Sequence, residues 1–231
     1  ALTPRFAPAC SARQLAGIAA LARAHPGVWV QTHVAENRDE IAWARALFPA
    51  SRSYLAVYDD HGLMRRRAVY AHCIHLDDAD RQLMRATGAA AAVSPTSNLF
   101  LGSGFFDFDG AQQHGMHHGL ASDVGGGTSF SPFHTMLAAY YAGREGQTKP
   151  GLSLKPSRLW WLHTGGAARA LGLEGVIGTL QPGSEADFVL LDPKATPLLA
   201  RKTERAQNLE ELLFALIVLG DDRVVDQVVI A

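Results

Sequence analysis

Short apolar runs alternate with amphipathic segments along roughly the first 145 residues of the chain. Each apolar run is followed by a segment in which apolar residues recur at helical spacing. This order of strand and helix occurs four times, which is typical of a parallel sheet with helical crossovers. The pattern therefore predicts an α/β fold. The expected strands are residues 28–32, 69–73, 89–93 and 117–121.

Polar residues that cap helices mark where the helical segments begin. Ser11, Asn37 and Asp77 each precede a segment with an apolar face, and their side chains can accept hydrogen bonds from the first free N–H groups of a helix. A helix is expected after each of them, whereas residues 94–98 are expected to form a loop. Further helices are expected at residues 54–60, 131–144, 156–171 and 208–219.

Polar side chains gather at the carboxyl ends of the expected strands, at His33, His72, Asn98 and Asp123. Parallel (β/α)8 barrels, or TIM barrels, carry their sites on that face. The sequence contains only four strand–helix units, however, whereas a complete barrel needs eight. Residues 1–175 are therefore expected to form one half of a TIM barrel.

The remaining residues, 176–231, have a different pattern. A β-unit at residues 177–191 is followed by a helix and then by a strand at residues 224–230. Two or three strands do not make a stable sheet unaided. This region is therefore expected to take strands from elsewhere in a longer chain or from a partner.

Composition narrows the classes of function. The chain has 231 residues, a formal charge of −1 and no basic run longer than Arg65-Arg66-Arg67, which argues against nucleic-acid and membrane-surface partners. Its two cysteines form no CxxC motif, so a reducing compartment is expected. There is no apolar stretch of transmembrane length, and residues 1–6 lack the features of a signal peptide. These features favour a cytoplasmic protein.

Three potential metal ligands end three different expected strands: His33, His72 and Asp123. Imidazole nitrogen and carboxylate oxygen suit a zinc-like divalent ion, which can lower the pKa of a water molecule towards neutrality. Glu36 lies one turn after His33 and could move protons as a general acid and base. Each histidine could instead be a satisfied core residue, and Asp123 a cap or loop carboxylate. The set as a whole favours a metal-dependent hydrolase.

Other polar features give weaker evidence for a site. The GGG run at residues 125–127 lacks the lysine of a phosphate-binding loop, so it is expected to let the backbone pass close to a small substrate. Arg5 and Phe6, between two prolines, offer a donor fork and an aromatic face that suit a planar heterocycle. The remaining histidines considered are expected to be structural or at the surface: His75, His114, His117, His118, His134 and His163.

At these residues the sequence resembles the guanine deaminases of the amidohydrolase superfamily, over nearly the whole chain. The His-x-x-Glu, His and Asp set is shared by many amidohydrolase deaminases, whereas TPRF and DVGGG are more specific to guanine deaminases. The resemblance implies that residues 1–175 are the C-terminal half of the barrel and that residues 176–231 are part of a composite β-sandwich. The matching motifs are TPRFAP at 3–8, HVAENRDE at 33–40, AHC at 71–73, PTSN at 95–98, DVGGGTS at 123–129 and IGTLQPGSEAD at 177–187.

The resemblance also implies a role for each site residue. His33 and Asp123 would bind zinc, with one ion per active site, and Asp123 would take a proton from the attacking water. Glu36 would protonate a ring nitrogen of the purine and relay protons to the leaving ammonia, while His72 would steady the intermediate. Arg5 and Phe6 would hold the base, with His33, Glu36 and Asp123 completing the substrate contacts. The implied reaction converts guanine and water to xanthine and ammonia, in purine catabolism.

The sequence departs from the family in one large respect. Guanine deaminases have a His-x-His pair on the first barrel strand, which supplies two more zinc ligands, and this sequence contains no such pair. It is therefore expected to be the C-terminal portion of a guanine deaminase that binds zinc weakly and is inactive alone. The family also implies a homodimer. If the DNA upstream of Ala1 encodes an in-frame His-x-His pair, the chain is the C-terminal portion of a longer guanine deaminase.

Two other functions stay open at this point. The chain could belong to another amidohydrolase, such as a deaminase of methylthioadenosine or S-adenosylhomocysteine type or a chlorotriazine hydrolase, because the PTSN segment is compatible with these. It could also be a non-catalytic structural or dimerising fragment. A substrate panel tests the first alternative, and metal analysis combined with ammonia release tests the second.

Overall fold

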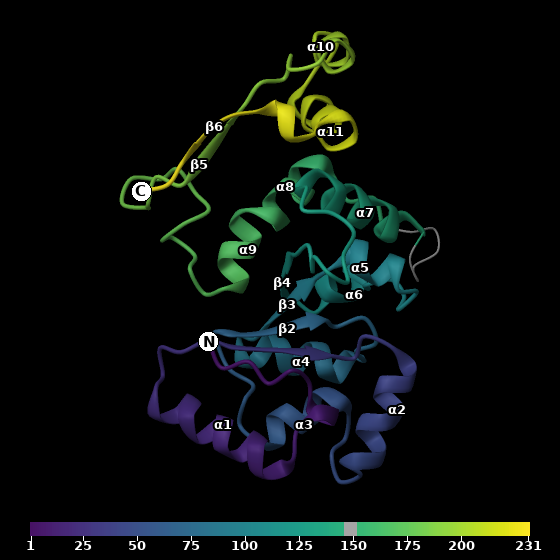
Figure 1. The fold of residues 1–231 in the computed structure, drawn as a ribbon, viewed down its shortest axis with the longest axis vertical. Helices are drawn as coiled ribbons and strands as arrows, with labels where there is room; N and C mark the ends of the chain where they lie inside the picture. Colours follow the sequence, from purple (N-terminus) through teal and green to yellow (C-terminus); the bar gives the residue numbers. More distant parts are fainter. Residues whose placement is uncertain (146–151) are drawn as a thin grey trace.

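A four-stranded parallel sheet forms the centre of the structure, a computed structural model that describes residues 1–145 and 152–231 (Figure 1). Because neighbouring strands are parallel, their carboxyl ends meet at one edge of the sheet. The α/β class predicted from the alternating pattern is confirmed. The strands lie side by side in the order β1 (Val30–Val34), β2 (Ala68–His72), β3 (Ala90–Val93) and β4 (His117–Leu120).

The predicted cap residues begin the helices between these strands. Ser11 Oγ accepts a hydrogen bond from the backbone N–H of Gln14, whose side chain accepts one in return from the backbone of Ser11. Asn37 and Asp77 cap their helices in a similar way. The helices up to residue 145 are α1 (Ala12–Ala24), α2 (Arg38–Leu47), α3 (Tyr54–Asp60), α4 (Asp78–Thr87), α5 (Pro95–Phe100), α6 (Phe108–Gln113) and α7 (Pro132–Glu145), with a short 3₁₀ turn, η1 (Ala7–Ala9).

Two segments differ from the sequence-based expectation. The PTSN segment, expected as a loop, is the first part of helix α5, with Pro95 at the first helical position, where its missing N–H costs nothing. The single helix expected from Pro156 is broken at Thr164 into α8 (Pro156–His163) and α9 (Gly165–Ala170). The glycine pair that follows Thr164 weakens helix continuation.

The break at Thr164 lets α9 turn back onto strand β4. A Cβ atom placed at Gly119 of β4 would lie only 2.8 Å from the Cα atom of Ala167 in α9. Glycine at this position is therefore what allows the helix backbone to approach the strand so closely.

The C-terminal region forms a separate two-stranded antiparallel sheet with two helices, shown in yellow-green at the top of Figure 1. Residues 177–180, expected to be extended, contribute only an isolated bridge between Glu174 and Ile177. The boundary between residues 175 and 176 stays a prediction. The elements are β5 (Phe188–Leu191), α10 (Pro197–Thr203), α11 (Leu209–Leu219), a 3₁₀ turn, η2 (Asp222–Val224), and β6 (Val225–Val229).

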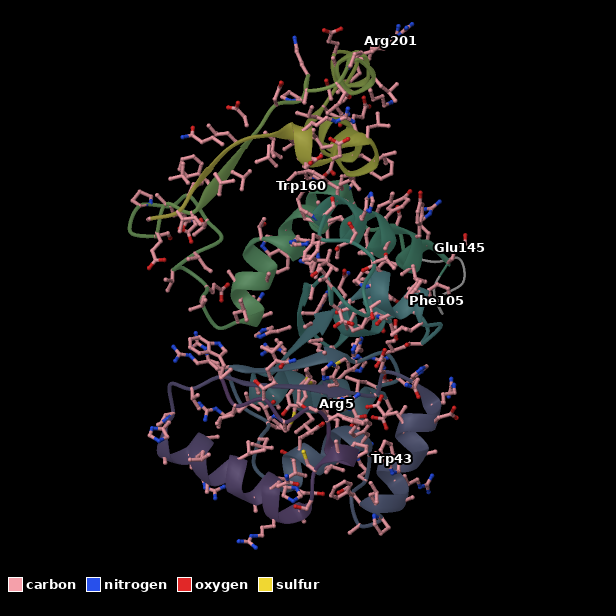
Figure 2. All side chains as sticks on the ribbon, viewed as in Figure 1. Arg5, Trp43, Phe105, Glu145, Trp160 and Arg201 are labelled. Atoms are coloured by element: carbon pink, nitrogen blue, oxygen red, sulfur yellow. The ribbon has the colours of Figure 1, made fainter. Side chains whose placement is uncertain are left out.

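Helix α11 connects this region to the parallel sheet by packing on α7 and α8. The indole of Trp160 in α8 donates a hydrogen bond to the carbonyl of Leu213 at 3.3 Å, and Figure 2 shows Trp160 at this junction. Ser157, at the start of α8, also donates from its backbone N–H to Glu210 at 2.9 Å.

Buried residues on α3 and β2 build much of the core behind the strand ends. Tyr58 and Tyr70 are fully buried, and their ring centroids lie 5.3 Å apart. This aromatic contact fixes α3 against the sheet. None of the described helices combines the length and the apolar character needed to cross a lipid bilayer.

Candidate active site

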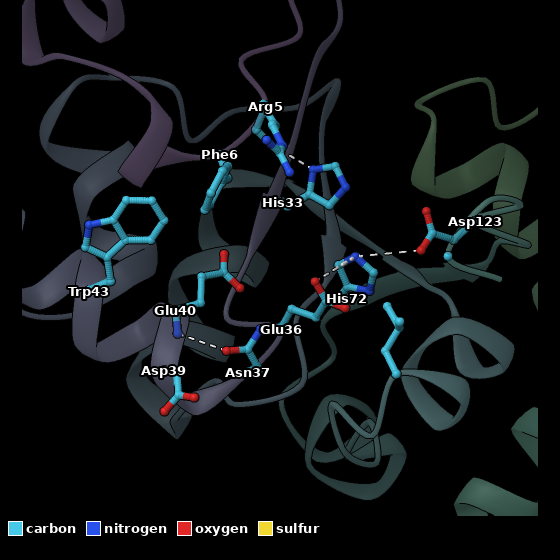
Figure 3. A pocket seen from close by; sticks show the side chains of 12 residues that line it. Arg5, Phe6, His33, Glu36, Asn37, Asp39, Glu40, Trp43, His72 and Asp123 are labelled. Carbon is cyan, nitrogen blue, oxygen red and sulfur yellow. Dashed lines mark hydrogen bonds and ion pairs between the residues drawn. The ribbon is translucent and has the colours of Figure 1, made fainter.

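A pocket of about 540 Å³ opens at the carboxyl ends of β1 and β2, next to the loop that follows β4. It brings together every residue that the sequence singled out for catalysis, base binding or metal binding (Figure 3). This volume is within the range of small-molecule sites. The pocket is lined by Arg5, Phe6, His33, Glu36, Asn37, Asp39, Glu40, Trp43, His72, Leu101, Asp123 and Gly126.

Three of the lining residues form a cluster suited to a metal ion. His33, His72 and Asp123 each offer one ligand atom, and these atoms all lie within 4.8 Å of one another. The two imidazole rings are 5.3 Å apart between centroids, and His72 Nε2 lies 4.0 Å from Asp123 Oδ2. Two imidazoles and one carboxylate are a donor set that zinc accepts.

A hydrogen bond fixes the tautomer of His33. Its Nδ1 lies 2.8 Å from the backbone carbonyl oxygen of Arg5, and a carbonyl oxygen can only accept. Nδ1 therefore carries the proton, and Nε2 is left with a lone pair. Metal-binding histidines are commonly oriented in this way by a partner of the other ring nitrogen.

The carbonyl of Arg5 is held in place by the surrounding polar groups. It also accepts from the backbone N–H of His33 and from Thr32 Oγ1, both at 3.3 Å. The buried hydroxyl of Tyr58 donates to the carbonyl of His33 and accepts from the N–H of Ala7, both at 2.8 Å. One tyrosine thus joins the segment before α1 to the end of strand β1.

The carboxylate of Glu36 is placed between the cluster and a serine. Its Oε2 lies 3.7 Å from His72 Nε2, and its Oε1 accepts a hydrogen bond from Ser103 Oγ at 3.0 Å. The side chain is only 17% exposed. Glu36 can therefore exchange protons with groups inside the pocket while most of it is shielded from water.

Unusual backbone conformations concentrate at the strand ends that build the site. Four non-glycine residues near the pocket have positive φ angles between 49° and 68°, a left-handed conformation that side chains with a Cβ rarely adopt. Such strain is maintained only where the surrounding structure over-determines it, and it often marks functional sites. The residues are Ala35, His72, Cys73 and Asp123.

The glycine run after Asp123 lets the loop backbone pass close to the carboxylate. A Cβ atom at Gly126 would lie 2.9 Å from Ser97 Oγ and 3.0 Å from Asp123 Oδ2. Ser97 Oγ is buried and has no hydrogen-bond partner within the described residues. Glycine at position 126 is therefore what allows the loop backbone to lie so close to Ser97 and to the carboxylate of Asp123.

Aromatic and basic groups line the other side of the pocket. The guanidinium carbon of Arg5 lies 5.2 Å from the centroid of the Phe6 ring, and the Trp43 ring meets Phe6 edge-on at 5.7 Å. Behind them, Tyr54 donates a 2.6 Å hydrogen bond to the buried carboxylate of Glu40. Burial raises the pKa of Tyr54 far above its usual range, so this phenol stays a donor.

Sequence reasoning missed Glu40, Trp43 and Ser103. A signal for the first two was present, because Glu40 and Trp43 are three residues apart on the helix that begins just after Glu36, and so share one face of it. Nothing comparable marks Ser103, which reaches Glu36 through a loop.

The histidines expected to be structural do not line this pocket. His118 lies at the amino-terminal end of β4, where burial lowers its pKa to about 4 and its Nδ1 donates to the carbonyl of Met116. His75 is bonded through Nε2 to the carbonyl of Ser103, and burial lowers its pKa. The imidazoles of His118 and His75 therefore stay neutral near pH 7.

Comparisons with known proteins agree with this geometry. The amidohydrolase family model matches residues 1–231. The guanine deaminase of Escherichia coli strain K12 is 41% identical over 223 residues, which cover 96% of this chain and 50% of that protein. The chain thus spans about half the length of the curated relatives that it matches.

Solved structures give the same picture. An E. coli guanine deaminase structure superposes with a TM-score of 0.94 at 39% identity, covering 98% of this chain and 52% of that one. A guanine deaminase from C. acetobutylicum, solved with guanine in its active site, gives a TM-score of 0.87 at 28% identity, covering 98% and 53%. The parallel sheet of this chain therefore matches part of an amidohydrolase barrel.

Proposed function

Because the chain belongs to the amidohydrolase family, we propose that its pocket binds guanine and supplies residues for the hydrolytic release of its amino group as ammonia. One observation carries this proposal. A single pocket joins the guanidinium of Arg5 and the ring of Phe6 to a cluster of potential metal ligands and to the adjacent carboxylate of Glu36. The guanine deaminases that resemble the chain support the choice of substrate.

Arg5 and Phe6 would hold the purine. The Phe6 ring offers a face for stacking, and Trp43 supports it from the edge. The guanidinium of Arg5 offers a planar fork of donors that suits the carbonyl oxygen of guanine. These contacts would orient the ring so that the carbon bearing the amino group faces the cluster.

His33 and Asp123 would hold a zinc ion, and His72 lies beside them. When bound, zinc acts as a Lewis acid and makes water a better nucleophile near neutral pH. The fixed tautomer of His33 fits this role, since its Nε2 lone pair is free.

The protein's own groups would then manage the protons. Asp123 would accept a proton from the attacking water, and Glu36 would donate one to a ring nitrogen next to the reacting carbon. Water adds to that carbon, and the proton taken up by Asp123 would then pass by way of Glu36 to the amino group. The bond to the amino group breaks, ammonia leaves, and the hydroxyl proton of the new carbonyl group returns to Glu36. His72 lies within 4.0 Å of both carboxylates and would steady the tetrahedral centre by hydrogen bonding.

We also propose that the protein acts in the cytoplasm as a homodimer. Exposed apolar side chains on the small antiparallel sheet, including Val189 and Val228, support self-association. Light scattering after size-exclusion chromatography measures the mass in solution. A monomer at all concentrations would contradict the dimer.

The function is tested by binding and by turnover. Calorimetry should show that the zinc-treated 231-residue chain binds guanine in preference to adenine, methylthioadenosine and a chlorotriazine. Ammonia release from guanine is then measured for this chain and for the product of any longer reading frame that contains it. Glu36→Gln should retain guanine binding and abolish turnover wherever turnover is seen. Equal affinity for all four ligands would overturn the proposal.

A further inference from the structure

Asn98 occupies a position that the proposed reaction leaves unexplained. It lies on α5, is 2% exposed, and its Oδ1 lies 2.9 Å from Nδ1 of His72. An amide oxygen can only accept a hydrogen bond, so Nδ1 of His72 is the donor. The lone pair of His72 Nε2 is then directed away from Asn98.

The opposite side of the His72 ring faces the reacting groups. Nε2 lies 3.7 Å from Glu36 Oε2 and 4.0 Å from Asp123 Oδ2. The ring is buried, with 1% of the residue exposed, and its backbone is in the strained left-handed region. Water therefore offers little competition for Nδ1, and Asn98 is its one polar partner among the described residues.

Asn98 is itself fixed by its helix and by the loop that follows. Its N–H donates to the carbonyl of Ser94, and its own carbonyl accepts from the N–H of Ser103, both at 2.9 Å. Ser103 in turn donates through Oγ to Glu36 at 3.0 Å. Asn98 thus contacts His72 directly and is one backbone hydrogen bond away from the residue that holds Glu36.

We propose that Asn98 is a positioning residue that fixes His72 as the Nδ1–H tautomer and keeps Nε2 facing Glu36 and Asp123. The neutral amide does this without adding a charge to a site that already holds two carboxylates. A histidine whose Nδ1 had no acceptor would be free to carry its proton on Nε2 or to rotate. The proposal deepens the proposed function, because His72 is part of that site, but its test contains no guanine.

The test measures the ring 15N chemical shifts of His72 in the labelled 231-residue chain at one fixed pH, assigned through His72→Gln. In the unchanged chain, Nδ1 should have the shift of a protonated ring nitrogen and Nε2 that of an unprotonated one. Asn98→Leu, which keeps the size but removes the acceptor, should shift population to the Nε2–H form. Asn98→Asp, which keeps an acceptor oxygen, should leave Nδ1 protonated. If the leucine variant does not fold, the aspartate variant is compared with the unchanged chain on its own.

Thr96→Val is the matched control. Thr96 lies on the same helix and donates to the carbonyl of Ser122 at 3.3 Å, so its loss perturbs α5 without touching His72. This variant should leave the His72 shifts unchanged. The proposal is overturned if Nδ1 is unprotonated in the unchanged chain, if Asn98→Leu leaves the shifts unaltered, or if Thr96→Val moves them equally. Absence of guanine turnover would count against the proposed function alone.

Discussion

The imidazole Nδ1 of His33 donates a 2.8 Å hydrogen bond to the backbone carbonyl of Arg5. This contact joins the residue proposed to hold the base to the residue proposed to hold the metal. The Phe6 backbone forms a parallel bridge with His33, so the base-binding segment lies along the end of strand β1. Displacement of one residue would therefore change the geometry of the other.

The donor cluster predicts zinc binding that depends on residues from both outer strands of the sheet, His33 on β1 and Asp123 after β4. His33→Ala and Asp123→Ala should each lower zinc affinity by at least the roughly 10–100-fold seen when an outer partner of a metal ligand is lost. Calorimetry of the zinc-free chain measures this. His134→Ala, an exposed position on α7, should have no effect. An equal loss in all three variants would show that zinc binds elsewhere.

The absolute affinity for zinc should be below that of four-ligand structural sites, because the described cluster offers three donors.

The hydroxyl of Tyr58 should stabilise the fold as well as the site. Tyr58→Phe leaves the N–H of Ala7 and the carbonyl of His33 without this partner, which costs about 1–3 kcal/mol for a buried group. Urea unfolding measures the loss. Tyr70→Phe is the comparison, because the equally buried Tyr70 hydroxyl makes one hydrogen bond within the described residues, to the carbonyl of Leu63 at 3.1 Å. A larger loss in Tyr70→Phe would contradict this account.

The sequence predicted most of what depends on local pattern. Strand positions, caps such as Asn37, and the collection of His33 and Asp123 at one edge follow from periodicity and from the geometry of parallel strands. The helix at Pro95–Phe100 was missed because Ser, Thr and Asn have weak helix propensity, and here buried tertiary contacts override it.

The extent of the site could not be predicted in the same way. Ser103 reaches Glu36 only because the loop after α5 folds back onto it, a contact across 67 residues that no periodic pattern records. The path of α9 after Thr164 depends similarly on its close approach to Gly119. Both features are set by tertiary packing.

Burial of His118 predicts a loss of stability in mild acid. Its pKa in the folded chain is lowered to about 4, from 6.5, mainly by burial. Between pH 6.5 and 4 this histidine is protonated in the unfolded chain but stays neutral in the folded chain. Its contribution to the free energy of unfolding is therefore fully present above pH 6.5 and decreases as the pH falls towards 4. The contribution lost by pH 4 is about 3 kcal/mol. The pKa of His163 is also lowered by burial and acts in the same direction.

The pH dependence is checked by urea unfolding at several values between pH 7 and pH 4. His118→Asn keeps a donor but removes the titration, so its unfolding free energy should fall less steeply with acid. Carboxylates with lowered pKa values, such as Asp77, contribute equally in both proteins and cancel in the comparison. An identical slope in the two proteins would exclude His118 as a cause.

Arg5 should determine affinity for the carbonyl edge of guanine. Within the described residues its guanidinium makes no hydrogen bond to another side chain, so its donors are free for a ligand, and the Phe6 ring lies beside it in the same pocket. Lysine keeps the charge but loses the planar fork. Because hydrogen bonds from charged groups contribute about 1.5–3 kcal/mol, Arg5→Lys should weaken guanine binding roughly 10–100-fold.

Calorimetry with two bases separates recognition of the carbonyl from a general effect on the pocket. 2-Aminopurine lacks the 6-oxo group of guanine, so Arg5→Lys should change its affinity little while guanine affinity falls. Arg13→Lys, an exposed position on α1, should change neither. If Arg5→Lys weakened both bases equally, Arg5 would act by shaping the pocket through Phe6 and His33, and the carbonyl oxygen of guanine would have to be read by another residue.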